Sequence, residues 1–203
     1  MASRTSWLFL LCACASAQSS SDWTPWSARP EIAPATSREG TTLTVSGAGN
    51  PAAYGGWTRR IDAIQPGAWY RFSASYRAQG VASENWQVVA RIDWLDSAGR
   101  RAGQPEYAAW RRHENGWSHL EATAPAPSQA ISARLELFLA NAPNGRLDWR
   151  DVQLTPTSAP PERRIRVASI NLRPDRVSSP AESVRQFVEV ARRRVSGKAD
   201  LIL

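Results

Sequence analysis

Cysteine, lysine, histidine and methionine are all scarce in this chain of 203 residues. It has two cysteines, two histidines and one methionine, and Lys198 is its single lysine. Both cysteines lie within the first 14 residues, so a chain cleaved after them has neither a disulfide framework nor a thiol nucleophile in the part shown here. His113 and His119 have no partners at metal-ligand or triad spacing, so we expect both to be surface residues.

Long apolar runs are also missing, apart from residues 7–15. This run follows Arg4, precedes the small residues Ala15-Ser16-Ala17, and is too short to span a bilayer. These features predict a signal peptide at residues 1–17 and therefore a secreted or periplasmic protein without a transmembrane span. Lipid attachment at Cys14 is the alternative interpretation of the same segment.

The net charge of +7 does not form a basic stripe, because the excess of arginine lies mainly after Glu162 and the larger part of the chain is nearly neutral. Nucleic-acid binding requires a basic surface carried by a fold, so we expect no nucleic-acid partner. A hydrophobic fraction of 42% and a charged fraction of 21% are typical of a folded globular protein.

Residues 21–156 alternate between apolar and polar side chains, which is typical of strands with one buried face. The central runs are residues 69–78 and 86–95, and Gly80 between them favours a hairpin. Their predicted inward residues are Tyr70, Phe72, Ala74, Tyr76, Ala78, Trp86, Val88, Ala90, Ile92 and Trp94. About eight such strands, including a short one at residues 31–33, and no convincing helix predict a mainly β chain that forms an antiparallel two-sheet sandwich.

Two stretches of this region carry a family resemblance. They are Gln65-Pro66-Gly67-Ala68-Trp69-Tyr70-Arg71-Phe72-Ser73 and Leu147-Asp148-Trp149-Arg150-Asp151-Val152-Gln153-Leu154. Together they resemble carbohydrate-binding modules with a galactose-binding-like jelly roll. The resemblance implies a jelly-roll sandwich, a polysaccharide partner and a structural calcium ion held by Glu31 and Asp151. Arg150 departs from the family pattern, in which an acidic residue is usual at that position.

Tryptophan is abundant, with ten residues in the chain. Exposed aromatic rings can stack on sugar rings while polar neighbours bind the hydroxyl groups. The candidate sugar-binding residues are Trp69, Tyr107, Trp110 and Trp117, because they lie off the predicted core face or near loops. The alternative is structural: these rings plug the ends of the sandwich or pack against the next domain.

After a linker at residues 157–163, the pattern changes. Residues 165–171 predict a strand, Ser179 and Glu182 form a capping box for a helix that ends at Gly197, and residues 199–203 begin a second strand. The helix has an apolar face made of Val184, Phe187, Val188, Ala191 and Val195. Residues 164–203 are therefore predicted to be a parallel β-α-β unit, a fragment of an incomplete α/β domain.

The strand at residues 166–172 and the run Gly197-Lys198-Ala199-Asp200-Leu201-Ile202-Leu203 resemble the start of the carbon–nitrogen hydrolase (nitrilase) superfamily. The resemblance implies amide or nitrile hydrolysis by a Glu-Lys-Cys triad that lies beyond Leu203, so no catalytic residue is assigned in this chain. The rest of that hydrolase domain would be the partner of the tail, with no cofactor required. Asn171 suits the endonuclease/exonuclease/phosphatase superfamily instead, and a non-catalytic binding or structural role is a further alternative.

Overall fold

The computed structural model describes residues 22–195 and 199–203, and it divides into two units that meet between Ala159 and Pro160. The predicted signal peptide, Cys14 and Gly197 lie outside the described residues. Among the residues described, no helix has the length and apolarity needed to cross a bilayer.

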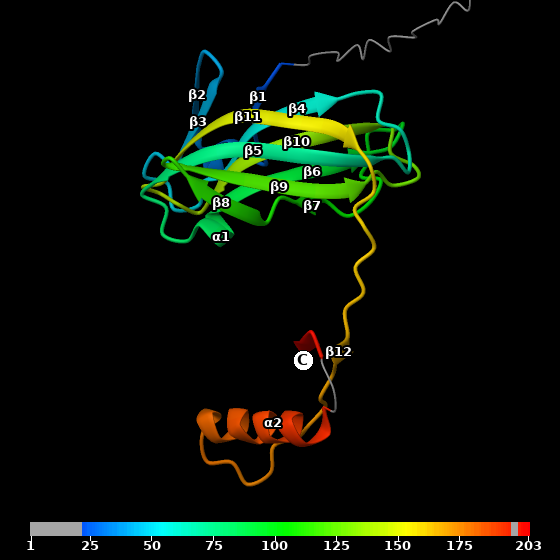
Figure 1. Ribbon diagram of the computed structural model, residues 1–203. Helices are drawn as coiled ribbons and strands as arrows, with labels where there is room; N and C mark the ends of the chain where they lie inside the picture. The colour runs from blue at the N-terminus through cyan, green and yellow to red at the C-terminus, as the bar shows by residue number, and fades with distance from the viewer. Residues whose placement is uncertain (1–21, 196–198) are drawn as a thin grey trace, which may run out of the picture. The chain divides into compact units, whose positions relative to one another are not determined.

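The first unit is a sandwich of two antiparallel sheets (Figure 1). The five-stranded sheet has the order β1 (Thr24–Ser27), β4 (Tyr54–Ile61), β10 (Ser132–Ala140), β6 (Val88–Leu95) and β7 (Glu106–Tyr107). The six-stranded sheet has the order β2 (Ala35–Glu39), β3 (Thr42–Ser46), β11 (Arg146–Thr157), β5 (Trp69–Gln79), β9 (Trp117–Pro125) and β8 (Trp110–Glu114). The predicted mainly β, two-sheet fold is confirmed, with more strands than the sequence indicated.

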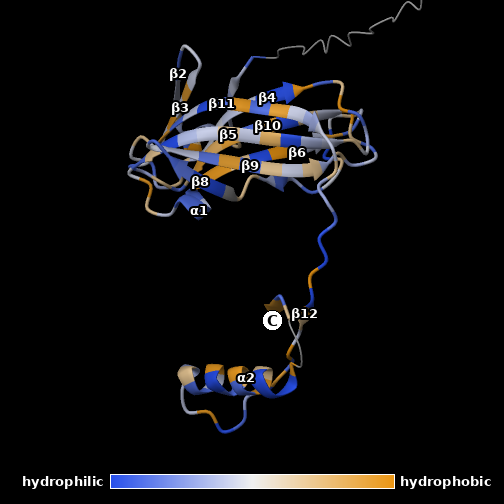
Figure 2. Ribbon diagram, in the orientation of Figure 1, coloured by the Kyte–Doolittle hydropathy of each residue, from blue (hydrophilic) through white to orange (hydrophobic). Residues whose placement is uncertain are grey.

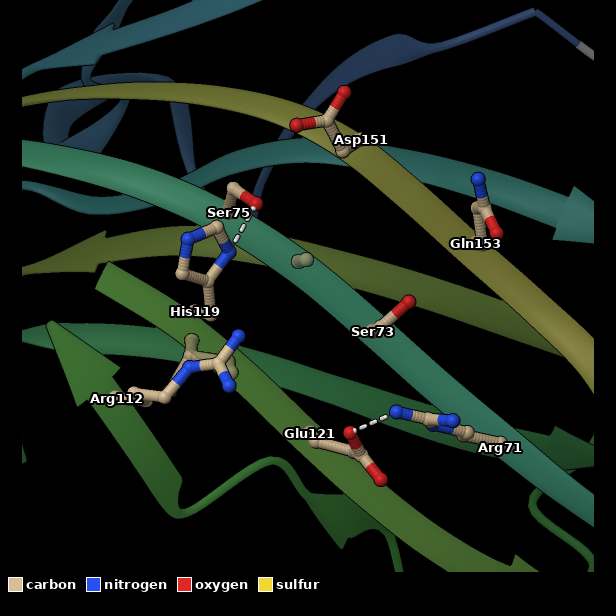
Figure 3. Close-up of a pocket in the computed structure, with 10 residues that line it drawn as sticks. Arg71, Ser73, Ser75, Arg112, His119, Glu121, Asp151 and Gln153 are labelled. Carbon is tan, nitrogen blue, oxygen red and sulfur yellow. Dashed lines mark hydrogen bonds and ion pairs between the residues drawn. The ribbon is translucent and has the colours of Figure 1, made fainter. Parts of the chain in front are cut away.

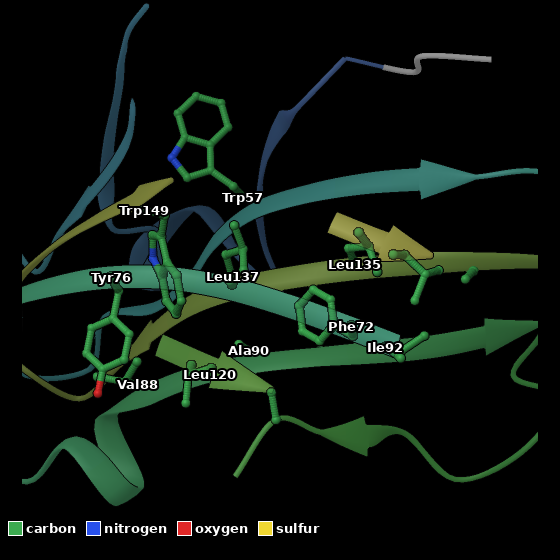
Figure 4. Close-up of a cluster of buried hydrophobic side chains, with 14 of the residues drawn as sticks. Trp57, Phe72, Tyr76, Val88, Ala90, Ile92, Leu120, Leu135, Leu137 and Trp149 are labelled. Atoms are coloured by element: carbon green, nitrogen blue, oxygen red, sulfur yellow. The ribbon is translucent and has the colours of Figure 1, made fainter. Parts of the chain in front are cut away.

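The core lies between the sheets and is built by the predicted alternation. Phe72 of β5, Ile92 of β6 and Leu135 of β10 are fully buried, and Trp149 of β11 packs against Tyr76 with ring centroids 5.2 Å apart (Figure 4). Because side chains alternate along a strand, burial of this set turns the intervening residues of β5, β9 and β11 outward.

The predicted hairpin between β5 and β6 is wrong. β5 pairs with β9 and β11, whereas β6 pairs with β10 and β7 in the other sheet. Gly80, with a φ of +63°, and the short helix α1 (Glu84–Gln87) carry the chain from one sheet to the other. Alternation reports which face of a strand is buried but not which strand lies beside it, so the pattern could not reveal this crossing.

Two further predictions from the sequence are wrong. Trp86 is not a core residue: it lies on α1 with 81% of its surface exposed. The helix is held in place because Tyr76 donates a hydrogen bond to Glu84 and Arg111 donates to the Glu84 carbonyl at 2.7 Å. Residues 31–33 do not form a strand, because Glu31 lies in the 3-10 helix η1 (Pro30–Ile32).

The second unit contains β12 (Val167–Ala168), α2 (Pro180–Arg194) and β13 (Leu201–Ile202). β12 and β13 pair in parallel, as predicted for a β-α-β unit. The Ser179 hydroxyl accepts a hydrogen bond from the Glu182 amide at 3.2 Å, which confirms the predicted N-cap. Hydrophilic and hydrophobic residues alternate around α2 (Figure 2), and its apolar side lines a cavity of about 640 Å³ within this unit.

Candidate functional site

A groove of about 380 Å³ runs over the outer face of the six-stranded sheet (Figure 3). Its floor consists of outward side chains of β5, β9 and β11, with one residue of β8. The polar residues that line it are Arg71, Ser73, Ser75, Arg112, His119, Glu121, Asp151 and Gln153. Side chains alternate along β5, so the strand buries Phe72 and Tyr76 on one face and contributes polar residues to the groove on the other.

Pairs of groove side chains fix one another in place. Ser75 and His119 are direct neighbours in the β5–β9 ladder, and the Ser75 hydroxyl lies 2.8 Å from Nδ1 of His119. Arg71 donates a hydrogen bond to Glu121 across the same two strands. These contacts hold four polar groups in defined positions along the floor (Figure 3), which lowers the entropy lost when a ligand binds them.

A β-bulge shapes the side of the groove formed by β11. The register between β11 and β5 shifts between Arg150 and Gln153, and Asp151 has a left-handed backbone with a φ of +54°. Bulges redirect side chains at the edges of binding sites, and strained backbone is frequent at functional sites. The Asp151 carboxylate faces the groove (Figure 3) and lies 3.1 Å from Nε of Arg150.

The calcium site predicted at Glu31 and Asp151 remains an untested prediction. Calcium takes six to eight oxygen ligands, several of them carboxylates. Over residues 22–195 and 199–203, no group of three or more His, Cys, Asp or Glu side chains is suited to hold a metal ion. Glu31 belongs to η1, where its carbonyl accepts a hydrogen bond from Asn50, and Asp151 pairs with Arg150.

Two of the predicted aromatic residues lie on the groove side of the six-stranded sheet. Trp69 begins β5 opposite Pro125 and is half-buried. Trp117 begins β9, and its ring stacks against Arg150, whose Cζ lies 3.8 Å from the ring centroid, with Cζ of Arg77 at 4.7 Å. Guanidinium stacking covers part of the Trp117 ring, so Trp69 is the better placed of the two for contact with a ligand.

The other two predicted residues differ in position. Trp110 pairs with Glu121 at the start of β8, and its side chain falls outside the described part of the structure. Tyr107 lies on β7, at the edge of the five-stranded sheet, where its hydroxyl accepts a hydrogen bond from Arg91 at 2.6 Å. Tyr107 is therefore not part of the groove.

Sequence reasoning missed the polar floor of the groove. The signal was present as the outward residues Arg71, Ser73 and Ser75 of the best-defined strand, and as His119 and Glu121 at the same spacing in β9. Without the order of the strands, nothing indicated that these two sets lie side by side.

No family model matches the sequence, and no protein of curated function matches it. Among solved structures, the enzymatically active domain of tailspike protein 4 from bacteriophage CBA120 is similar with a TM-score of 0.52 and 15% identity, over 68% of this chain and 20% of that chain. The present chain thus spans about a fifth of the tailspike chain.

Two further structures are similar at lower TM-scores. The family 22 carbohydrate-binding module of Clostridium thermocellum Xyn10B gives 0.44 at 17% identity, over 66% of this chain and 84% of that one. The accessory secretory protein 1, 2 and 3 structure from Streptococcus pneumoniae gives 0.48 at 12% identity, over 64% and 90%. The likeness is one of fold, since the first unit is an antiparallel two-sheet β-sandwich, and no comparison supports a carbon–nitrogen hydrolase in the tail.

Proposed function

We propose that the first unit is a non-catalytic carbohydrate-binding module that holds a polysaccharide chain in the groove over β5, β9 and β11. The observation that carries the proposal is the floor of paired polar side chains, Ser75 with His119 and Arg71 with Glu121. Sugar hydroxyl groups both donate and accept hydrogen bonds, and this floor offers a guanidinium, a carboxylate, an imidazole and hydroxyl groups within one open groove.

Trp69 lies at one end of the β5–β9 ladder and supplies an aromatic ring beside this polar floor. Stacking of one sugar ring on it would contribute on the order of 1 kcal/mol, like an aromatic pair. Each hydrogen bond to the polar floor adds about 0.5–1.5 kcal/mol net, because it replaces one to water. One stacked ring and a few such bonds together reach about 4 kcal/mol, so we expect an affinity for polysaccharide in the millimolar range.

Export by the predicted signal peptide would bring this module to the place where extracellular polysaccharide is found. A secreted binding module needs no catalytic group of its own, because its role is to keep the attached protein on the polymer.

Binding of the chain to insoluble cellulose, xylan, β-glucan and peptidoglycan tests the proposal, with tryptophan fluorescence as a second readout. We expect at least one polymer to bind, and Arg71→Ala to weaken binding about tenfold because it also frees Glu121. The matched control is Tyr107→Ala, which removes a polar aromatic residue from the other sheet and should bind like the wild type. Absence of binding to all four polymers, or equal binding by Arg71→Ala and the wild type, would reject the proposal.

A second candidate function concerns residues 160–203, whose exposed apolar side chains favour a role as part of a larger α/β structure. Val184 and Val188 on α2, and Leu203 beside β13, leave a large apolar surface exposed within the unit. We propose that further α/β structure covers this surface, as the resemblance to carbon–nitrogen hydrolases implies. Release of ammonia from amide and nitrile substrates by the natural gene product tests that activity, and no release from either class would reject it.

A further inference from the structure

A second cavity, of about 600 Å³, is lined by residues of both sheets of the sandwich. Arg59 of β4 lines it from the five-stranded sheet, while Leu43 of β3 and Val152 of β11 line it from the six-stranded sheet. Trp23, which precedes β1, and Arg38 of β2 complete the wall. The cavity combines apolar side chains, an indole ring and guanidinium groups.

Arg59 occupies a position where the strand pattern calls for an apolar residue. Trp57, two residues earlier on the same face of β4, is buried, and its indole N–H donates to the carbonyl of Thr44 in the opposite sheet at 2.9 Å. Arg59 therefore points toward the interior, and desolvation lowers the pKa of its guanidinium. An arginine at such a position normally has a carboxylate partner.

The structure gives Arg59 no such partner. Its Nε atom is buried and makes no hydrogen bond, and within the described residues the side chain has neither a hydrogen bond nor an ion pair. Its nearest aromatic contact is Trp23, whose ring centroid lies 5.5 Å from Cζ. Buried polar groups without partners are rare, and a charged one is costly, so the position requires a functional explanation.

The two carboxylates that also line the cavity are engaged elsewhere. Asp22 accepts hydrogen bonds from Arg38 and from the Trp23 amide, and Asp151 lies 3.1 Å from Nε of Arg150. Asp22 offsets only part of the effect of burial on Arg59, through its charge. Among the residues that the structure describes, the guanidinium of Arg59 is thus the charge lining this cavity that makes no ion pair.

We propose that the cavity binds a carboxylate attached to a six-membered ring, with the carboxylate on Arg59 and the ring against Trp23, Leu43 and Val152. A guanidinium presents a planar fork that matches a carboxylate, and a cavity of this volume accepts one or two rings. Uronic acids and aromatic acids share this chemistry. The cavity shares Asp151 with the groove, but the residues proposed to hold the ligand do not line the groove, so the proposal does not depend on polysaccharide binding there.

Thermal unfolding and tryptophan fluorescence of the full chain, titrated with D-glucuronate, benzoate and D-glucose, test the proposal. We expect at least one of the two acids to raise Tm and change the fluorescence in a saturable way, and D-glucose to do neither. A response to glucuronate alone identifies a sugar acid as the ligand class, a response to benzoate alone an aromatic acid, and a response to both the shared carboxylate.

Arg59→Gln should abolish this response while it leaves the Tm of the ligand-free protein equal or higher, because it removes a half-buried charge that has no ion pair among the described residues. Arg60→Gln is the matched control, since Arg60 points to the opposite face and pairs with Asp62. If Arg59→Gln fails to fold, Arg59→Lys keeps the charge without the fork and should bind about tenfold more weakly. No response to either acid, or a wild-type response in the folded Arg59 variant, would overturn the proposal.

Discussion

Replacement of Glu136 by alanine should destabilise the sandwich by about 3–5 kcal/mol, because it leaves a buried arginine without a counterion. The Glu136 side chain is 1% exposed and accepts hydrogen bonds from Nε of Arg91 and, at 2.9 Å, from Nε of Arg134. Arg91 is itself only 13% exposed. Burial alone would lower the pKa of Arg91, but the hydrogen bond and charge of Glu136 raise it, so Arg91 is charged in the folded protein.

Arg134 still has a carboxylate partner in the Glu136→Ala variant, since it also donates to Asp93. The expected loss of stability therefore comes from Arg91, and this loss is a large share of the 5–15 kcal/mol that stabilises an ordinary domain. Urea unfolding followed by tryptophan fluorescence should show a lower midpoint with an unchanged slope, and Tm should fall by roughly 10 °C or more.

The matched control is Glu121→Ala, which removes a carboxylate from an exposed pair. The side chains of Arg71 and Glu121 are 55% and 40% exposed, and such pairs contribute at most about 1 kcal/mol. Equal losses of stability in Glu136→Ala and Glu121→Ala would show that burial of the ion pair does not decide the cost. The double variant Arg91→Met/Glu136→Leu should recover most of the stability, because apolar side chains of similar size replace the whole pair.

Three further predictions follow from single positions. Burial, together with the hydrogen bond to Glu84, raises the pKa of Tyr76 to about 12. The stability that the neutral Tyr76 hydroxyl contributes is therefore intact below about pH 10, and about 2–3 kcal/mol of it is lost as the pH rises toward 12. In melts at alkaline pH, the Tm of Tyr76→Phe should fall less than that of the wild type. Gly56→Ala should cost about 3 kcal/mol or more in urea unfolding, because the new Cβ would lie 2.2 Å from the carbonyl oxygen of Leu137. Trp86→Ser should leave the free energy of unfolding within about 0.5 kcal/mol of the wild type, and a loss of several kcal/mol would show that this ring packs in the core after all.

The buried face of each strand could be predicted from the sequence because the pleat imposes a period of two. Phe72, Ile92 and Leu135 are inward for that reason. Strand partners could not be predicted, since the same alternation fits a hairpin or a crossing to the other sheet. Trp86 shows most clearly what alternation cannot predict. Its position continues the alternation of β6, but Trp86 lies on the short helix α1, which contacts of Glu84 with Tyr76 and Arg111 hold in place.

The candidate groove was predictable only in its parts. Strand alternation predicts that Trp69 and Trp117 lie off the core face, and both lie on the groove side of the six-stranded sheet. The polar floor joins Arg71, His119 and Asp151, three residues far apart in the sequence that only the order of β9, β5 and β11 brings together. Tyr107 lies outside this groove because β7 belongs to the other sheet, and its role as a sugar-binding residue stays a prediction.

A variant that fills the groove tests most directly whether polysaccharide binds there. Ser73 faces outward between Arg71 and Ser75 and has no side-chain hydrogen bond among the described residues, so Ser73→Trp fills the groove and leaves the core untouched. We predict that this variant keeps the wild-type Tm and loses binding to the polymer that retards the wild type in affinity electrophoresis, while Tyr107→Ala is retarded normally. Wild-type retardation of a correctly folded Ser73→Trp variant would show that polysaccharide does not bind in the groove.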